Sequence, residues 1–437
     1  MTQKVIAPFK GFHYNPEKIK DLAQVVAPPY DVIDEKYRDR LYDQNPYNVV
    51  KLILTKDQDA PAGKTKYDAA RGYLDQWKQD QVLVQDQTPQ IYLYHQTYTL
   101  EDGRQLTRKG FIARRRIESF EEGKIRPHEY TFAGPKADRL NLTKATETNL
   151  SPIFGIFSDS KRETEALFQS TTSQKPLFDL KTDDGNRHQL WLIGDEAIQS
   201  KLNQIMSDKV ILIADGHHRY ETALNYRNLK RAENPAAVDS AYDYVMMYCC
   251  AMEDEGLVIL PTHRVVKVPL NDSLEAIQQR LAASFTVTSY SKADQKKALA
   301  HLAELSQHQI AFLVSLKGDQ LLLLATDAKR VAEISELKSY PAPVRELDVV
   351  ILHQYLLPHI FRVDAAEDHD SVKVQYVKDT QEALSYVEKG EATLSFILNP
   401  TKIAQVESVS SIGERMPHKS TFFYPKLLSG LVFNPLV

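Results

Sequence analysis

The sequence predicts a mixed α/β protein in two parts, residues 1–265 and 266–437. Apolar runs of strand length alternate with segments of helical spacing along the chain. The 437 residues exceed what one hydrophobic core usually serves, so the chain should divide. From about Pro269, helix and strand candidates alternate more regularly than before, which places the boundary near residue 265.

The first part should contain both helices and a sheet. Residues 25–33 are expected to be extended, because Pro28 and Pro29 restrain the residues before them. The other elements follow in this order: helix 34–44, strand 49–54, helix 64–79, hairpin strands 90–98 and 108–117, an irregular segment 119–151, strand 153–157, a strand and helix within 210–228, and strands 242–252 and 258–260.

The second part should be another α/β unit, ending in an aromatic and basic tail over 416–426. Its predicted elements are helices 274–283 and 292–306 and strands 285–289, 310–315, 321–325, 372–377 and 393–398.

Composition narrows the class of protein. The net charge is −4, whereas a duplex-DNA binder usually carries a basic surplus, so the charge argues against nucleic acid as a partner. The only two cysteines, Cys249 and Cys250, are adjacent, which excludes a disulfide framework and predicts buried thiols. We find no apolar signal-peptide core and no run near the roughly 20 apolar residues of a membrane span, which predicts a cytoplasmic protein without a membrane partner. The oligomeric state is left open.

The most distinctive motif is Asp-Gly-His-His-Arg at 215–219. It follows an apolar run and opens a segment of helical spacing. A strand, a glycine and a helix start together present backbone N–H groups and the positive end of a helix dipole. Gly216 lets the backbone approach a ligand, and His217, His218 and Arg219 add side-chain donors. The motif therefore predicts a phosphate site. Asp215 has two interpretations, the N-cap of the helix or a magnesium ligand or base.

A second group of polar residues falls in the irregular segment. Glu129 or His128 could act as a general base on a hydroxyl, and Lys136 and Arg139 could neutralise phosphate. The alternative is a solvated charged loop. Asp31, after the proline pair, is a base in reserve, with a simple turn as its alternative.

Several familiar signatures are missing from the sequence. It contains no Gly-x-x-x-x-Gly-Lys-Ser/Thr loop, no Gly-x-Gly-x-x-Gly and no Gly-x-Ser-x-Gly elbow. Their absence argues against a P-loop enzyme, a Rossmann dehydrogenase and an α/β-hydrolase.

Segments spread along the chain resemble the domain of unknown function family 1015. They are 27–32, 127–129, 134–140, 149–154, 214–224 and 417–425. The resemblance by itself gives no activity.

The 215–219 motif also resembles the phosphate box of the ParB/sulfiredoxin-like superfamily, which includes ParB nucleotidases, sulfiredoxin and the archaeal free-serine kinase. The resemblance implies a ParB-like nucleotide-binding core in which residues 216–219 hold phosphate. His217 and His218 stand where sulfiredoxin has a reactive cysteine, and no helix-turn-helix is evident. The kinase-like interpretation therefore fits best.

The sequence as a whole predicts an enzyme that transfers phosphoryl on a small metabolite. It would be a kinase or phosphatase, with serine or phosphoserine among the candidate substrates. Magnesium would be expected, with ATP or ADP as the nucleotide. The alternative is a non-enzymatic ParB-like regulator that senses a nucleotide or associates with nucleic acid.

Overall fold

The computed structural model describes residues 4–131, 133–270, 272–363 and 373–437, which form two compact units. Unit 1 comprises Met1–Pro127, Thr131–Val258 and Pro425–Val437, and unit 2 comprises His128–Tyr130 and Ile259–Tyr424. These units differ from the two predicted segments. The main boundary between the two units follows Val258, and residues 425–437 belong to unit 1 again.

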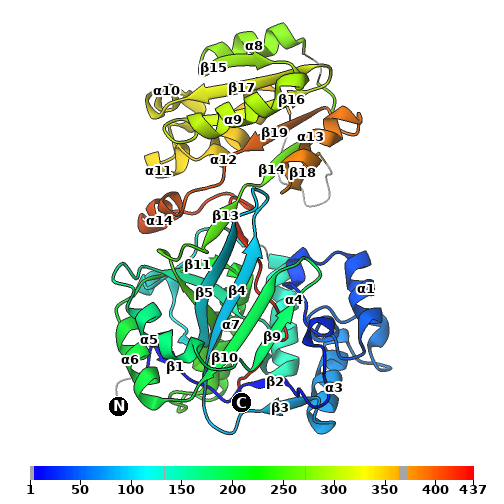
Figure 1. Ribbon diagram of the computed structural model, residues 1–437, viewed down its shortest axis with the longest axis vertical. Coiled ribbons are helices and arrows are strands. Elements are labelled where there is room, and N and C mark those ends of the chain that lie inside the picture. Colours follow the sequence, from blue (N-terminus) through cyan, green and yellow to red (C-terminus); the bar gives the residue numbers. More distant parts are fainter. Residues whose placement is uncertain (1–3, 132, 271, 364–372) are drawn as a thin grey trace. The chain divides into compact units, whose positions relative to one another are not determined.

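Unit 1 is built on a sheet that has nine strands within the described residues (Figure 1). In spatial order the strands are β6 (Ile125–Arg126), β11 (Ile211–Asp215), β8 (Ile153–Phe157), β12 (Tyr244–Ala251), β5 (Gln105–Arg116), β4 (Ile91–Thr99), β10 (Arg187–Ile193) and β9 (Phe178–Lys181), with β1 (Ile6–Ala7) also on β5. β11 runs parallel to β6, and β12 runs parallel to β8, while the remaining pairs are antiparallel. The predicted mixed α/β class is confirmed.

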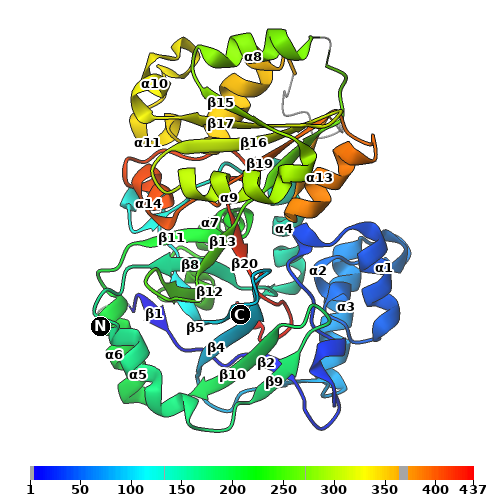
Figure 2. The same ribbon diagram turned by 45° about the horizontal axis from the view of Figure 1, so that its top comes forward.

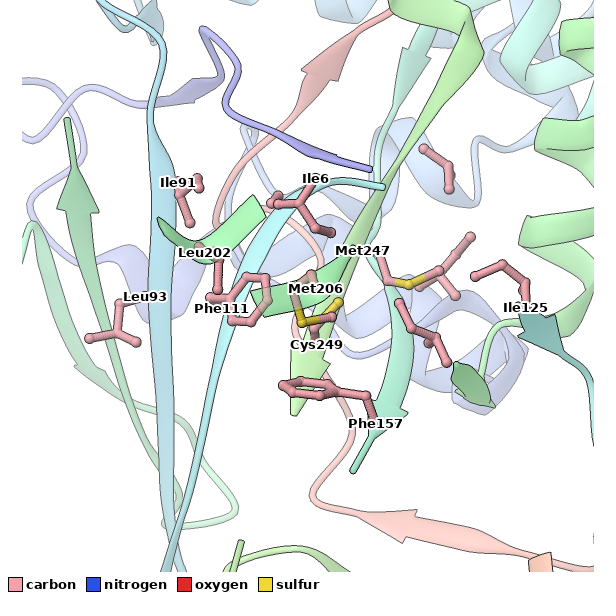
Figure 3. Close-up of a cluster of buried hydrophobic side chains, with 14 of the residues drawn as sticks. Ile6, Ile91, Leu93, Phe111, Ile125, Phe157, Leu202, Met206, Met247 and Cys249 are labelled. Carbon is pink, nitrogen blue, oxygen red and sulfur yellow. The ribbon is translucent and has the colours of Figure 1, made fainter. Parts of the chain in front are cut away.

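One face of this sheet carries the main core of unit 1. Side chains alternate along a strand, so Leu93 on β4, Phe111 on β5 and Cys249 on β12 point to the same face. Figure 3 shows these side chains with Met206 and Leu202 from a covering helix. The helices that contribute to this core are α5 (Glu163–Thr172), α6 (Glu196–Met206) and α7 (His217–Glu233).

The opposite face holds the C-terminal segment 425–437. The fully buried Arg108 donates to the Pro425 carbonyl oxygen at 2.5 Å, and Gln96 Nε2 donates to the Lys426 carbonyl oxygen at 3.0 Å. Arg114 Nε donates to Asn434 Oδ1 at 2.7 Å. These side chains fix the segment across β4 and β5.

A helical part completes unit 1. It contains α1 (Glu35–Gln44), α2 (Val50–Ile53), α3 (Lys66–Gln79) and α4 (Ala133–Thr146), with short elements η1 (Leu22–Gln24), η2 (Tyr30–Val32), η3 (Asp57–Asp59), η4 (Phe120–Glu122), η5 (Ala241–Asp243), β2 (Phe12–Tyr14), β3 (Leu83–Gln85), β7 (Thr148–Asn149) and β21 (Asn434–Pro435). The predicted helices 34–44 and 64–79 are confirmed, and Asp34 and Thr65 cap them.

Three local predictions in unit 1 were wrong. The predicted strand 49–54 is the short helix α2, because its apolar residues are buried all round and such a run carries no period. The irregular segment 119–151 contains the 14-residue helix α4, which begins with Gly134 and Pro135 in its first turn. Within the extended segment 25–33, residues 30–32 form the 3-10 helix η2.

Unit 2 contains a second, antiparallel sheet, with six strands among the residues described. In spatial order they are β15 (Thr286–Tyr290), β17 (Gln320–Thr326), β16 (Ile310–Leu316), β19 (Leu394–Leu398), β14 (His263–Val266) and β18 (Val374–Val377). The helices α9 (Gln295–Leu305) and α13 (Thr380–Glu388) cover one face (Figure 2). The predicted helices and strands of this part are confirmed, except that residue 372, the predicted start of one strand, lies outside the described residues.

The other elements of unit 2 are short helices and strand pairs. They are α8 (Leu274–Ala282), η6 (Lys292–Asp294), α10 (Ala328–Glu333), η7 (Ser335–Leu337), α11 (Ala342–Arg345), α12 (Asp348–Ile351), η8 (Leu352–Ile360), α14 (Ile403–Ser411) and β20 (Phe422–Tyr424), which pairs with β13 (Val258–Leu260). Across the described parts of both units, no helix has the length and apolarity needed to cross a membrane.

Candidate functional site

The Asp-Gly-His-His-Arg motif joins strand β11 to helix α7, as its pattern predicted. Gly216, not Asp215, is the N-cap of α7, so the capping interpretation of Asp215 is wrong. Gly216 is in the left-handed region, with φ 91°, and a Cβ there would lie 2.9 Å from the Arg219 guanidinium. The turn therefore requires glycine for both its backbone angle and its close approach to Arg219.

Asp215 is held by two cations. Arg219 Nη2 lies 2.5 Å from Asp215 Oδ2, and Lys426 Nζ donates to Asp215 Oδ1. Arg219 Nη1 also donates to the Pro152 carbonyl oxygen. Burial alone would raise the pKa of Asp215, but Lys426 and Arg219 outweigh it and lower the pKa to about 2. Two cations on one ionised carboxylate leave a net positive charge at the start of α7.

Lys426 was not among the predicted site residues. It lies 211 positions from Asp215, in the segment that crosses the sheet of unit 1. Sequence spacing cannot relate residues so far apart. The basic composition of the tail was the only available signal.

Lys136 reaches the same turn from helix α4. Lys136 Nζ lies 2.8 Å from Glu221 Oε2, and Thr131 Oγ1 donates to the Glu221 carboxylate at 2.9 Å. Burial lowers the pKa of the half-buried His218; the Glu221 and Asp31 charges oppose this shift, and the Lys136 and Arg219 charges add a smaller lowering. His218 is therefore neutral at pH 7 and lies within electrostatic reach of both cations. His217, at the first position of α7, is buried.

Tyr30, Asp31 and Arg139 complete the surroundings of the turn. Arg139 lies over the Tyr30 ring at 4.2 Å from its centroid and donates to the Ile53 carbonyl oxygen at 2.7 Å. Burial raises the pKa of Tyr30, and the charges of Asp31, Arg139, Arg219 and Asp215 also act on it. The exposed Asp31 acts on His218 as well.

A small cavity of about 50 Å³ lies among Tyr30, Arg139 and Arg219. It has room for water-sized molecules, not for a nucleotide base. A larger ligand at this turn would lie on the outside of unit 1.

His128 and Glu129 belong to unit 2. The fully buried His128 places its Nε2 2.8 Å from Thr421 Oγ1, and Glu129 Oε1 accepts the Ser420 N–H at 3.2 Å. Glu129 also forms a parallel bridge with Met416. The general-base roles of His128 and Glu129 remain predictions, because both residues belong to unit 2.

The residues of the turn do not fit a magnesium ion. Each oxygen of Asp215 is held by a cationic side chain, so the donor set is already neutralised. Throughout the described parts of the chain, no three His, Cys, Asp or Glu side chains gather as metal ligands. We derive no step through magnesium.

Comparison with known protein families finds one family that matches most of the chain. A family model described as "Protein of unknown function (DUF1015)" matches residues 6–350. The chain belongs to this family. The match covers the motif at 215–219 and α4, and it ends within unit 2. No curated protein matches the sequence.

Solved structures resemble the chain only distantly. A free serine kinase in complex with AMP is 14% identical, with 69% of this chain and 84% of that chain covered and a TM-score of 0.32. A conserved hypothetical protein from Pyrococcus furiosus is 15% identical, with coverages of 70% and 89% and a TM-score of 0.30. SbnI with C-terminal truncation from Staphylococcus aureus is 12% identical, with coverages of 74% and 87% and a TM-score of 0.36. Similarity of this degree fixes neither the ParB-like core nor an activity.

Proposed function

We propose that unit 1 binds the phosphate group of a small metabolite at the start of helix α7 and transfers that phosphoryl group, as a kinase or a phosphatase. The convergence of cationic side chains supports the proposal. Lys136 comes from α4, Arg219 from α7 and Lys426 from the C-terminal segment. Arg219 and Lys426 bind Asp215 beside the glycine N-cap, where the helix dipole adds further positive charge, and Lys136 binds Glu221 further along α7.

The ion pairs of the site are compatible with an incoming anion. Asp215 is matched by two cations, so a phosphate close to Arg219 and Lys426 meets a positive surplus. Lys136 is paired with Glu221 but keeps 29% of its side chain exposed, so its ammonium can turn toward a ligand. Arg139 is more firmly held, because it pairs with Asp138 and donates to the backbone. We therefore assign Arg139 to positioning Tyr30 and expect Lys136 to contact phosphate.

Two groups of unit 1 could handle protons. An acceptor hydroxyl, or a water molecule in a phosphatase, would give its proton to Asp31 as its oxygen forms the new bond to phosphorus. The bond between phosphorus and the leaving oxygen breaks in the same displacement. Neutral His218 would donate a hydrogen bond to a phosphoryl oxygen. The kinase reaction is tested with serine plus ATP or ADP, and the phosphatase reaction with phosphoserine alone.

Binding is tested by calorimetry with phosphoserine, ADP and ATP. We expect Lys136→Ala to weaken binding of the phosphorylated ligand about tenfold or more, because it removes a charge-assisted contact. Lys144→Ala is the matched control, since Lys144 is an exposed lysine at the other end of α4. Equal binding by the two variants would overturn the site.

Activity is tested by phosphorus NMR with serine plus ATP or ADP, and with phosphoserine alone. Turnover that Asp31→Asn abolishes, while the Kd of the phosphorylated ligand is unchanged, would support the base. Binding of CTP and DNA, without binding or turnover of the metabolites, would instead support the regulator.

A further inference from the structure

A cavity of about 950 Å³ opens on the core face of the unit 1 sheet, beside helix α5. Its walls are the ends of β4, β5, β8 and β12, helix α5 and the turn 253–256. None of the residues around the α7 turn lines it. The volume is that of a cavity for a small organic molecule.

The floor of the cavity is apolar and aromatic. Phe111 lies 5.7 Å from Phe168 and 6.3 Å from Phe157, measured between ring centroids. Leu93 and Cys249 complete the floor. Figure 3 shows Leu93, Phe111, Phe157 and Cys249 arising from neighbouring strands. These side chains are almost fully buried, and Phe168, at 6% exposed, has the most accessible surface among them, so a ligand would contact only the edges of this apolar floor.

His95 gives the cavity a buried hydrogen-bond acceptor. It is 9% exposed and packs edge-on against Trp191 with ring centroids 5.0 Å apart. Its ring nitrogens have no hydrogen-bond partner within the described residues, and the side chain lines the cavity. Burial and the charge of Lys109 lower the pKa of His95 to about 4, so at pH 7 the ring is neutral and keeps one nitrogen lone pair.

Asp254 supplies a carboxylate to the same cavity. Its Oδ1 accepts the Gly256 N–H at 2.9 Å and the Lys109 N–H at 3.4 Å. Within the described chain Asp254 makes no ion pair, since the Lys109 ammonium is 2.8 Å from Glu165 instead. Lys109 is also the strand partner of His95, so His95 and Asp254 flank one residue of β5.

The remaining charged groups of the cavity are largely satisfied. Arg162 pairs with Glu165 and Glu255. Asp159 accepts two N–H groups at the start of α5, and Glu253 accepts the Asp159 N–H. The lining holds five carboxylates against three cationic side chains, an excess of negative charge. This excess favours a cationic ligand over an anionic one.

We propose that this cavity binds a small organic primary amine, with its ammonium group between Asp254 and His95 and its apolar body on the phenylalanine floor. A carboxylate and a neutral imidazole are both acceptors, and an ammonium group offers three donors. The proposal is independent of the phosphate site.

The test uses the full chain and three probes that share a phenyl ring and differ in the end group: phenethylamine, phenethyl alcohol and hydrocinnamate. Calorimetry at pH 7.5 should show the amine binding at least tenfold more tightly than the alcohol or the acid. Asp254→Asn should weaken the amine at least tenfold and leave the alcohol unchanged, which also shows that the cavity is intact. Glu255→Gln, at a side chain 84% exposed, is the control and should stay within about twofold.

The pH dependence provides a second readout. Burial raises the pKa of Asp254 to about 6, so amine binding to the wild type should weaken as the pH falls through about 6. The charged or titratable groups that act electrostatically on Asp254 include Lys109 and Arg108 from β5 and Tyr248 and Cys250 from β12. In Asp254→Asn this step should disappear. Amine binding that Asp254→Asn leaves unchanged, hydrocinnamate bound as tightly as the amine, or no probe binding at millimolar concentration would overturn the proposal.

Discussion

Replacing Asp215 with asparagine should destabilise unit 1 by about 2 kcal/mol at pH 7. The substitution keeps the shape of the side chain and removes the charge that two cations share. Lowering the pKa of Asp215 from 3.8 to about 2 corresponds to about 2 kcal/mol, at about 1.4 kcal/mol per pKa unit. Because the side chains of Asp215, Arg219 and Lys426 are only 11%, 11% and 14% exposed, solvent screening reduces this figure little.

The sign of the pH dependence follows from the lowered pKa. The contribution of Asp215 is fully present above its ordinary pKa of 3.8 and is lost as the pH falls through about 2. The difference in unfolding free energy between wild type and Asp215→Asn should therefore be constant from pH 5 to 7 and shrink below about pH 4.

Urea denaturation followed by tryptophan fluorescence measures this difference in unit 1 alone. The only two tryptophans, Trp77 and Trp191, both belong to unit 1. Asp183→Asn, at an exposed turn of the same unit, is the control and should change stability by less than about 0.5 kcal/mol. Equal urea midpoints for wild type and Asp215→Asn at pH 7, or a gap in unfolding free energy that is as large at pH 3 as at pH 7, would refute the reasoning.

Three further outcomes are expected, each with its own measurement. Gly216→Ala should lower the urea midpoint of unit 1 by the equivalent of about 1–3 kcal/mol, because alanine resists the left-handed backbone there; an unchanged midpoint would contradict the geometry of the turn. Arg108→Met should destabilise unit 1 in the same assay and increase proteolysis of 425–437, since it removes the hydrogen bond to Pro425; cleavage at the wild-type rate would count against that contact. Cys249 and Cys250 should not react with Ellman's reagent in the native protein at pH 8, because burial raises the pKa of both thiols; rapid native labelling would show that they are accessible.

The sequence predicted elements whose local signals agree with their tertiary surroundings. The turn at Gly216 carries its own strand, glycine and helix start, and the structure places all three as expected. Helix α3 carries an amphipathic face and the Thr65 capping box. The short helix α2 was missed because buried residues on every side hide the helical period.

The phosphate-site candidates were only partly predictable. Lys136 contacts Glu221 because α4 packs beside α7. The sequence of α4 suggested a loop, so this packing could not be predicted. Lys426 and Asp215 meet through contacts made after the chain has passed through unit 2, and no local pattern encodes that return. The segment from 126 to 139 also looked like one polar group, whereas His128 and Glu129 belong to one unit and Lys136 and Arg139 to the other.

The return of residues 425–437 to unit 1 has a consequence for how the protein is made. A chain leaves the ribosome from its N-terminus, so the strands of unit 1 emerge well before the segment that satisfies Arg108, Gln96 and Asp215. During that interval unit 2 can fold. Unit 1 still lacks the segment that covers one face of its sheet, and Asp215 still lacks its contact with Lys426. The native contacts of unit 1 can therefore be completed only after unit 2 has been synthesised.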